Sequence, residues 1–135
     1  MRSRNTLIRM QRFLVDEKRR DVTQIEQMVA DFETKQTELQ SQIEAEQDSS
    51  GIFDVTHFAY PTFAKAAVVR RDNLKASIDG LQEQLEVVRE NLTELISELK
   101  RLESLGECED RVRRNEATYI EQRELDEVSA SMHQN

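Results

Sequence analysis

The fold is decided by residues 78–102, which read IDGLQEQLEVVRENLTELISELKRL. Apolar residues recur in this stretch at alternating steps of three and four, and they fill eight consecutive a and d positions of a heptad repeat. The eight residues are Ile78, Leu81, Leu85, Val88, Leu92, Leu95, Leu99 and Leu102. Burial of such side chains contributes on the order of 1.5–3 kcal/mol each, so the stripe requires a partner surface. The stretch therefore predicts one long helix of a coiled coil.

A second heptad pattern lies nearer the N-terminus and supplies the partner. Its a-type positions are Ile8, Val15, Val22, Val29, Gln36 and Ile43, and its d-type positions are Gln11, Lys18, Ile25, Phe32, Leu39 and Glu46. Eight of these twelve positions are apolar, which predicts a helix over residues 3–48. The composition agrees, since helix formers dominate and the chain has only three Gly and one Pro.

The segment between the two patterns predicts a bend. Gly51 can supply the left-handed residue that ends a helix, and Pro61 is tolerated in a first helical turn. Four of the seven aromatic residues of the chain also lie here: Phe53, Phe58, Tyr60 and Phe63. They can cap the end of the coiled-coil core, contact a partner, or do both.

Charge favours an antiparallel hairpin within one chain. Pairing residue i with a residue near 110 − i places the acidic stretch 32–48 opposite the basic stretch 62–78, and it places basic residues between 9 and 20 opposite Glu90, Glu94 and Glu98. A parallel homodimer would set like charges against each other. The predicted fold is all-α, with two long helices in an antiparallel coiled-coil hairpin.

We expect the hairpin to form a single domain over residues 1–135. Its helices would span 3–48 and 62–130, joined by a tip at 49–61, and the longer second helix would be unpaired beyond about residue 107 in this register. Gly106 takes the next a position, after which the heptad pattern fails. The tail is then either a single exposed helix or disordered until it binds a partner.

Composition argues against several classes of function. We find no constellation of catalytic residues, no metal site among the two His and one Cys, and no cofactor motif, so we expect no enzyme. The net charge of −8 disfavours nucleic-acid binding, and no apolar run approaches the roughly 20 residues of a membrane span. One cysteine excludes an internal disulfide, and we expect a cytoplasmic protein.

Charge is nevertheless uneven along the chain. Residues 1–20 carry seven basic and two acidic side chains, which leaves a charge of −13 on the remainder. Five arginines come close together in the hairpin register, and an unpaired end of this kind can engage an acidic protein surface. They are Arg2, Arg4, Arg111, Arg113 and Arg114.

Two segments resemble a known family. Residues 7–20, LIRMQRFLVDEKRR, are similar to the opening of FliJ-type flagellar export proteins, and residues 57–66, HFAYPTFAKA, resemble the tip of the alphaproteobacterial branch of that family. The resemblance implies a non-enzymatic stalk at the inner face of the cell membrane at the flagellar base. Its termini would enter the hexameric export ATPase ring, and its tip would reach the membrane export gate without inserting into the membrane.

The resemblance also implies contact residues. Tyr60, Phe63 and Ala67 match tip positions that contact the gate, although enteric members have a larger apolar residue at the position of Ala67. The five arginines would contact the ATPase ring, and export chaperones are further expected partners. The alternative is a general scaffold or export chaperone that binds secreted flagellar subunits along residues 112–128.

Overall fold

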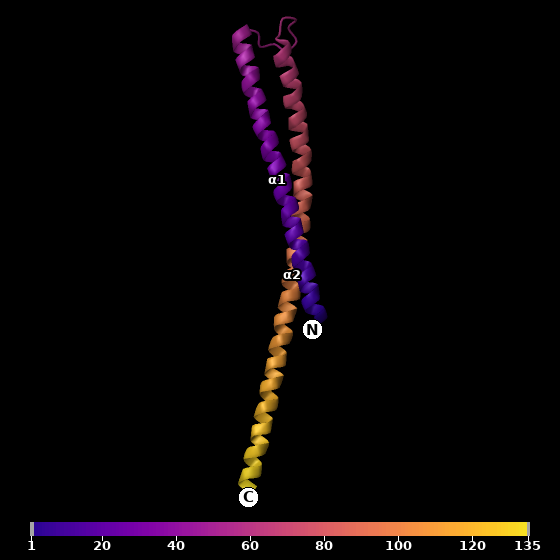
Figure 1. Ribbon diagram of the computed structural model, residues 1–135, viewed down its shortest axis with the longest axis vertical. Helices are drawn as coiled ribbons and strands as arrows, with labels where there is room; N and C mark the ends of the chain where they lie inside the picture. Colours follow the sequence, from indigo (N-terminus) through magenta and orange to yellow (C-terminus); the bar gives the residue numbers. More distant parts are fainter. Residues whose placement is uncertain (1, 135) are drawn as a thin grey trace. The chain divides into compact units, whose positions relative to one another are not determined.

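The computed structural model describes residues 2–134 of the chain, with side chains from Ser3 to Met132. Two helices make up the fold, α1 at Arg2–Ser50 and α2 at Thr62–Gln134, and no strand occurs within the described residues (Figure 1). The predicted all-α class, with a longer second helix, is confirmed. The expected bounds were 3–48 and 62–130, so α1 continues two residues further and α2 four residues further than the pattern indicated.

The chain divides into two compact units. We call Asp16–Thr93 the tip unit, and we call Met1–Val15 together with Glu94–Asn135 the terminal unit. Both helices continue from one unit into the other. The single-domain organisation expected from the sequence stays a prediction.

In the tip unit, the two helices pack antiparallel around an apolar core. Val22, Ile25 and Leu85 are buried together, and four partly buried residues pack against them: Val29, Leu81, Val88 and Leu92. Three contacts give the direction, because the number of the partner residue rises as the number of the α1 residue falls. They join Gln47 to Tyr60, Gln40 to Arg71 and Glu26 to Arg89, each within a few residues of the predicted pairing.

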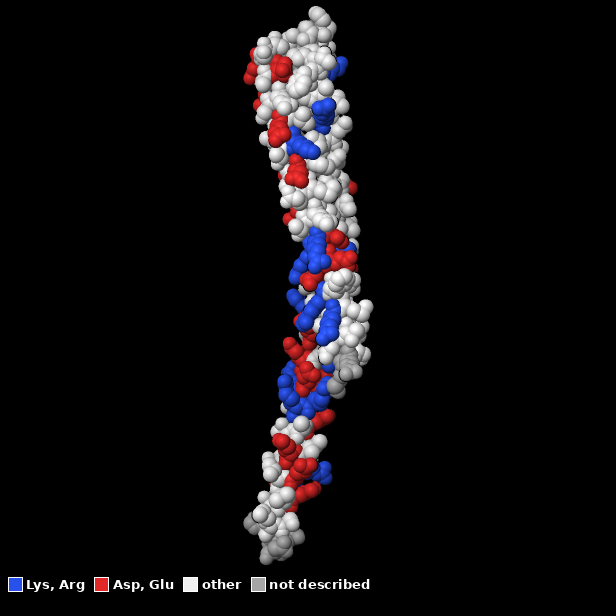
Figure 2. Space-filling view, viewed as in Figure 1, with Lys and Arg blue, Asp and Glu red and all other residues white. Residues whose placement is uncertain are grey.

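The buried seam of α2 extends further towards the tip than the sequence pattern indicated. Tyr60, Ala64 and Ala67 are buried, and Arg71 and Leu74 are half-buried, so the steps of four and three continue from Ile78 back to residue 60. Charge flanks this seam as expected, with acidic side chains over α1 and basic side chains over α2 near the tip (Figure 2). Such exposed charges contribute little stability but favour one register.

In the terminal unit, the helices also run antiparallel. The Gln11 side-chain amide donates to the Leu95 carbonyl at 3.1 Å, Arg12 lies 3.4 Å from Glu103, and Arg4 forms an ion pair with Glu109. Gly106 is buried here, and a Cβ at this position would lie 3.4 Å from the Arg4 Cδ atom. Every described side chain from Glu107 to Met132 is exposed, so the predicted C-terminal overhang is present and helical.

Gly80 offers a test of the helical state of α2. It lies inside the helix, and a Cβ built there would meet no atom within 4 Å. Glycine in a helix interior costs about 0.5–1 kcal/mol relative to alanine, because its unfolded backbone is more flexible. We expect Gly80→Ala to raise the free energy of unfolding by about 0.5–1 kcal/mol in urea denaturation. A lowered value would show that position 80 is not an open helical site.

Candidate partner-binding sites

A fixed turn structure begins where α1 ends. Gly51 adopts a φ of 74°, and its amide donates to the Gln47 carbonyl at 2.8 Å, which satisfies one of the last carbonyls of the helix. The Ser50 hydroxyl then accepts the Ile52 amide at 3.2 Å. At the other end of the segment, the Lys65 amide donates to the Pro61 carbonyl at 2.9 Å and opens α2. The loop at 51–61 is therefore anchored at both ends.

Asp54 organises the first half of this loop. Its Oδ1 atom accepts the Thr56 hydroxyl at 2.7 Å and the Thr56 amide at 3.0 Å. These bonds, the hydroxyl bond first, hold the pKa of the Asp54 carboxyl below its ordinary value. A lowered folded-state pKa means that this contribution to stability is present above the ordinary carboxyl pKa. It is lost as pH falls through the lowered value.

His57 organises the second half. Its Nδ1 atom accepts the Ala59 amide at 3.0 Å, and its carbonyl accepts the Tyr60 amide at 3.1 Å. Its ring stacks on the Phe58 ring at 4.8 Å between centroids. The result is a loop that holds Phe58 with 96% of its surface exposed.

The three predicted gate-contact residues differ in their exposure. Phe63 is 54% exposed, whereas Tyr60 and Ala67 are buried at 6% and 3%. The Tyr60 hydroxyl also accepts the Gln47 side-chain amide at 3.0 Å, which ties the end of the loop to the end of α1. Of the three, only Phe63 offers a large surface to a partner.

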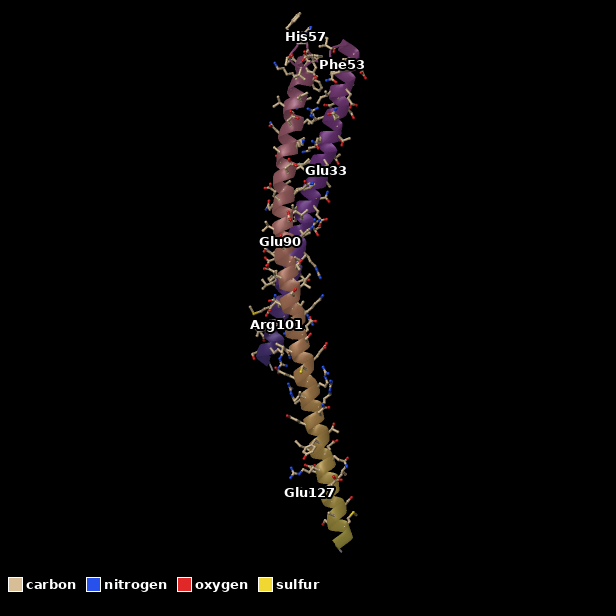
Figure 3. The ribbon with its side chains drawn as sticks, turned by 180° about the vertical axis from the view of Figure 1, so that it is seen from behind. Glu33, Phe53, His57, Glu90, Arg101 and Glu127 are labelled. Carbon is tan, nitrogen blue, oxygen red and sulfur yellow. The ribbon has the colours of Figure 1, made fainter. Side chains whose placement is uncertain are left out.

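Two further aromatic residues present apolar surface at the tip. Phe53 is 60% exposed and lies in the same loop as His57 (Figure 3), and Phe58 directly follows His57 in the sequence. The sequence placed Phe53 and Phe58 in the bend as possible partner contacts, but it did not include them among the predicted gate-contact residues. The available signal was the concentration of aromatic residues in the bend, and their exposure in the structure shows that both side chains lie outside the core.

The predicted arginine site lies in the terminal unit. The ion pair of Arg4 with Glu109 places Arg4 beside the α2 turn that carries Arg111 and Arg113, and only 18% of the Arg4 side chain is exposed. Arg113 lies 3.6 Å from Asp110 on the same helix. Among the described residues, Arg111 and Arg114 form no ion pair. The Arg2 side chain lies outside the described part of the chain.

The tail beyond Glu107 carries exposed apolar residues on a lone helix. They are Val112, Tyr119, Ile120, Leu125, Val128 and Met132, with exposed fractions between 51% and 74%. Shallow hollows lie beside Val112 and Tyr119 and beside Leu125 and Val128. Apolar surface left open in this way is typical of a segment that binds another protein.

Metal-binding clusters and membrane-spanning helices are both absent from the described residues. They contain no group of three or more His, Cys, Asp or Glu side chains arranged to hold a metal ion. They also contain no helix with enough apolar length to cross a membrane. Cys108 is exposed and carries no disulfide.

Comparison with known proteins gives the family. A family model described as Flagellar FliJ protein matches residues 5–135. No curated protein and no solved structure matches the chain. The match spans both helices, the tip loop and the tail, and it agrees with the two segments whose resemblance the sequence already indicated. The chain therefore belongs to the FliJ family of flagellar export components.

Proposed function

We propose that this chain is a non-enzymatic stalk of the flagellar export apparatus, which binds the hexameric export ATPase through its terminal unit and the membrane export gate through its tip. Both partners lie at the cytoplasmic side of the flagellar base, so the proposal places this chain there as well. The observation that supports the proposal is the separation of two unlike contact surfaces. The tip loop carries exposed aromatic residues, the start of the tail carries Arg111, Arg113 and Arg114, and the two belong to different compact units.

In this proposal, Phe63 contacts the gate directly. Phe53 and Phe58, in the loop that precedes it, add exposed aromatic surface. Exposed aromatic side chains dominate the binding energy of many interfaces because they bury a large area with little loss of freedom. Tyr60 and Ala67 are buried in the seam, and they fix the position of Phe63. Membership of the alphaproteobacterial branch stays a prediction.

At the other site, Arg111, Arg113 and Arg114 engage acidic loops of the ATPase ring. All three side chains are exposed, so their guanidinium groups are accessible. Arg4, which is already paired with Glu109, holds the two helices together at the base of the tail. Long-range attraction between such charges steers association and weakens with salt.

The ATPase rate tests the proposal. The matching export ATPase is titrated with the intact chain and with a variant truncated after Leu105, which removes the exposed tail and keeps the paired helices. Stimulation by the intact chain that disappears on truncation supports the ATPase contact. An intact chain that leaves the rate and the assembly of the ring unchanged would contradict the proposal.

Phe63→Ala is expected to weaken binding to the purified cytoplasmic domain of the gate by about tenfold or more, which corresponds to about 1.4 kcal/mol. The matched control is Val69→Ala, which removes a similarly exposed apolar side chain of α2 outside the loop, at 55% exposure. Titration calorimetry compares the two dissociation constants. Equal affinities for both variants would remove Phe63 from the contact.

One observation favours a second function. The apolar residues of the tail, from Val112 to Val128, would suit a chaperone that holds export subunits or their dedicated chaperones. A chaperone binds these subunits through the tail, whereas a stalk binds the ATPase there. Cross-linking from position 119 therefore separates the two functions by the identity of the captured protein.

A further inference from the structure

A groove runs along one side of the helix pair in the tip unit. It encloses about 750 Å³, and both helices line it. Its floor is apolar, since Leu85 belongs to the buried core and Val29 packs against that core. On α1 it spans residues 26–33, which is about 12 Å of helix at 1.5 Å per residue.

The walls of the groove are acidic. Glu26 and Glu33 come from α1, and Glu86 and Glu90 come from α2; Figure 3 labels Glu33 on α1 and Glu90 on α2. One cation, Arg89, also lines the groove and lies 3.8 Å from Glu26. An apolar floor between anionic walls suits an amphipathic helix whose apolar stripe is accompanied by basic side chains.

The chain itself carries such a helix. In the terminal unit, α1 exposes Leu7, Met10, Phe13 and Leu14, with exposed fractions from 40% to 62%. Their spacing places them on one face, and that face spans eight residues, as the α1 side of the groove does. Residues 2–15 contain four arginines and no acidic residue. Arg9 is exposed beside the stripe and forms no ion pair among the described residues.

We propose that residues 7–14 of one chain dock in the acidic groove of a second copy. Charge complementarity and matched length point to this occupant. Residues 7–14 and 26–33 belong to one uninterrupted helix, which cannot fold back on itself, so the occupant comes from another molecule. The contact is heterologous, because stripe and groove are different surfaces. This inference goes beyond the proposed stalk function and does not depend on it.

Sedimentation velocity of the full chain tests the proposal between about 5 and 200 µM, at low salt and at about 0.5 M salt, where exposed charges are screened. We expect the mean mass to rise above the 15.8 kDa monomer with concentration, and to rise less at high salt. A chain that stays monomeric throughout would overturn the proposal. Because the readout is mass, its failure is distinct from a failure to stimulate the ATPase.

Variants locate the contact. Glu33→Lys with Glu86→Lys reverses the groove, and Glu17→Lys with Asp31→Lys makes the same charge change at exposed positions outside it. We expect the first pair to abolish association and the second to preserve it, with helicity by circular dichroism retained in both. Equal association of the two variants would overturn the proposal. Arg9→Glu alone should also weaken association, and mixing it with the groove-reversed chain should restore part of it.

A labelled synthetic peptide of residues 2–20 serves as a separate probe. In the proposal, its fluorescence anisotropy rises on addition of the intact chain and does not rise with the groove-reversed chain. A monomeric chain whose groove binds other basic peptides but not this one would assign the groove to a different protein, and would overturn the proposal.

Discussion

Replacing Ile43 with alanine is expected to destabilise the tip unit by about 2–5 kcal/mol. Ile43 is 1% exposed and is the largest side chain that is fully buried among the described residues. The substitution loses the transfer free energy of three carbon atoms and leaves a cavity that two helices alone can close only in part. A helix pair has a thin core, so one such loss is a large part of its total stability.

Urea denaturation followed by helicity measures this loss. Met28→Ala is the control on the same helix, since Met28 is 45% exposed, and its effect should stay within about 0.5 kcal/mol. If the two variants unfold at the same urea concentration, Ile43 does not lie in the core that the structure describes.

Charge reversal of Arg111, Arg113 and Arg114 together is expected to abolish stimulation of the export ATPase. The side chains lie on a helix with every described residue exposed from Glu107 onward, so the change disturbs no core. Reversal converts attraction to an acidic ring into repulsion, and each such contact between accessible charges acts mainly on association. The ATPase rate at saturating concentrations of the variant is the measurement.

The matched control replaces the three arginines with lysine, which keeps the positive charge and changes the geometry of the hydrogen-bond donors. Lysine at all three positions preserves helix propensity and electrostatic steering, so this variant should retain most of the stimulation. Stimulation by the intact chain should also decline as salt rises. A charge-reversed chain that stimulates as well as the intact chain would place the ATPase contact elsewhere.

The seam of the helix pair was predictable because coiled-coil burial follows a simple spacing. All twelve a and d positions assigned between Ile8 and Glu46 are buried or half-buried, including the polar ones. Gln11 is accommodated because its amide reaches the Leu95 carbonyl. Position in the heptad decided burial even where residue type argued against it.

The part of the seam nearest the tip was missed for a physical reason. Ala64 and Ala67 carry a weak apolar signal and Arg71 carries a contrary one, so the pattern assigned from the sequence begins at Ile78. In the structure, Arg71 spans the two helices and donates to the Gln40 side chain at 2.9 Å. Counting threes and fours back from Ile78 would have placed residues 60 and 67 inside the core and Phe63 outside it.

The tip loop could not be derived from spacing at all. Its shape depends on individual hydrogen bonds of Asp54 and His57, which a periodic pattern does not encode. The concentration of aromatic residues did indicate a contact surface, but exposure separated Phe53, Phe58 and Phe63 from the buried Tyr60. The helical state of the tail was likewise left open by a sequence whose heptads fail after Gly106.

Whether one chain binds both partners at once tests the central claim most directly. Light scattering coupled to size exclusion measures the mass of a mixture of the export ATPase hexamer, this chain and the cytoplasmic domain of the export gate. A stalk with separate contact sites predicts one complex that contains all three. A mixture in which the gate domain displaces the chain from the ATPase would contradict the account, because both partners would then share one site.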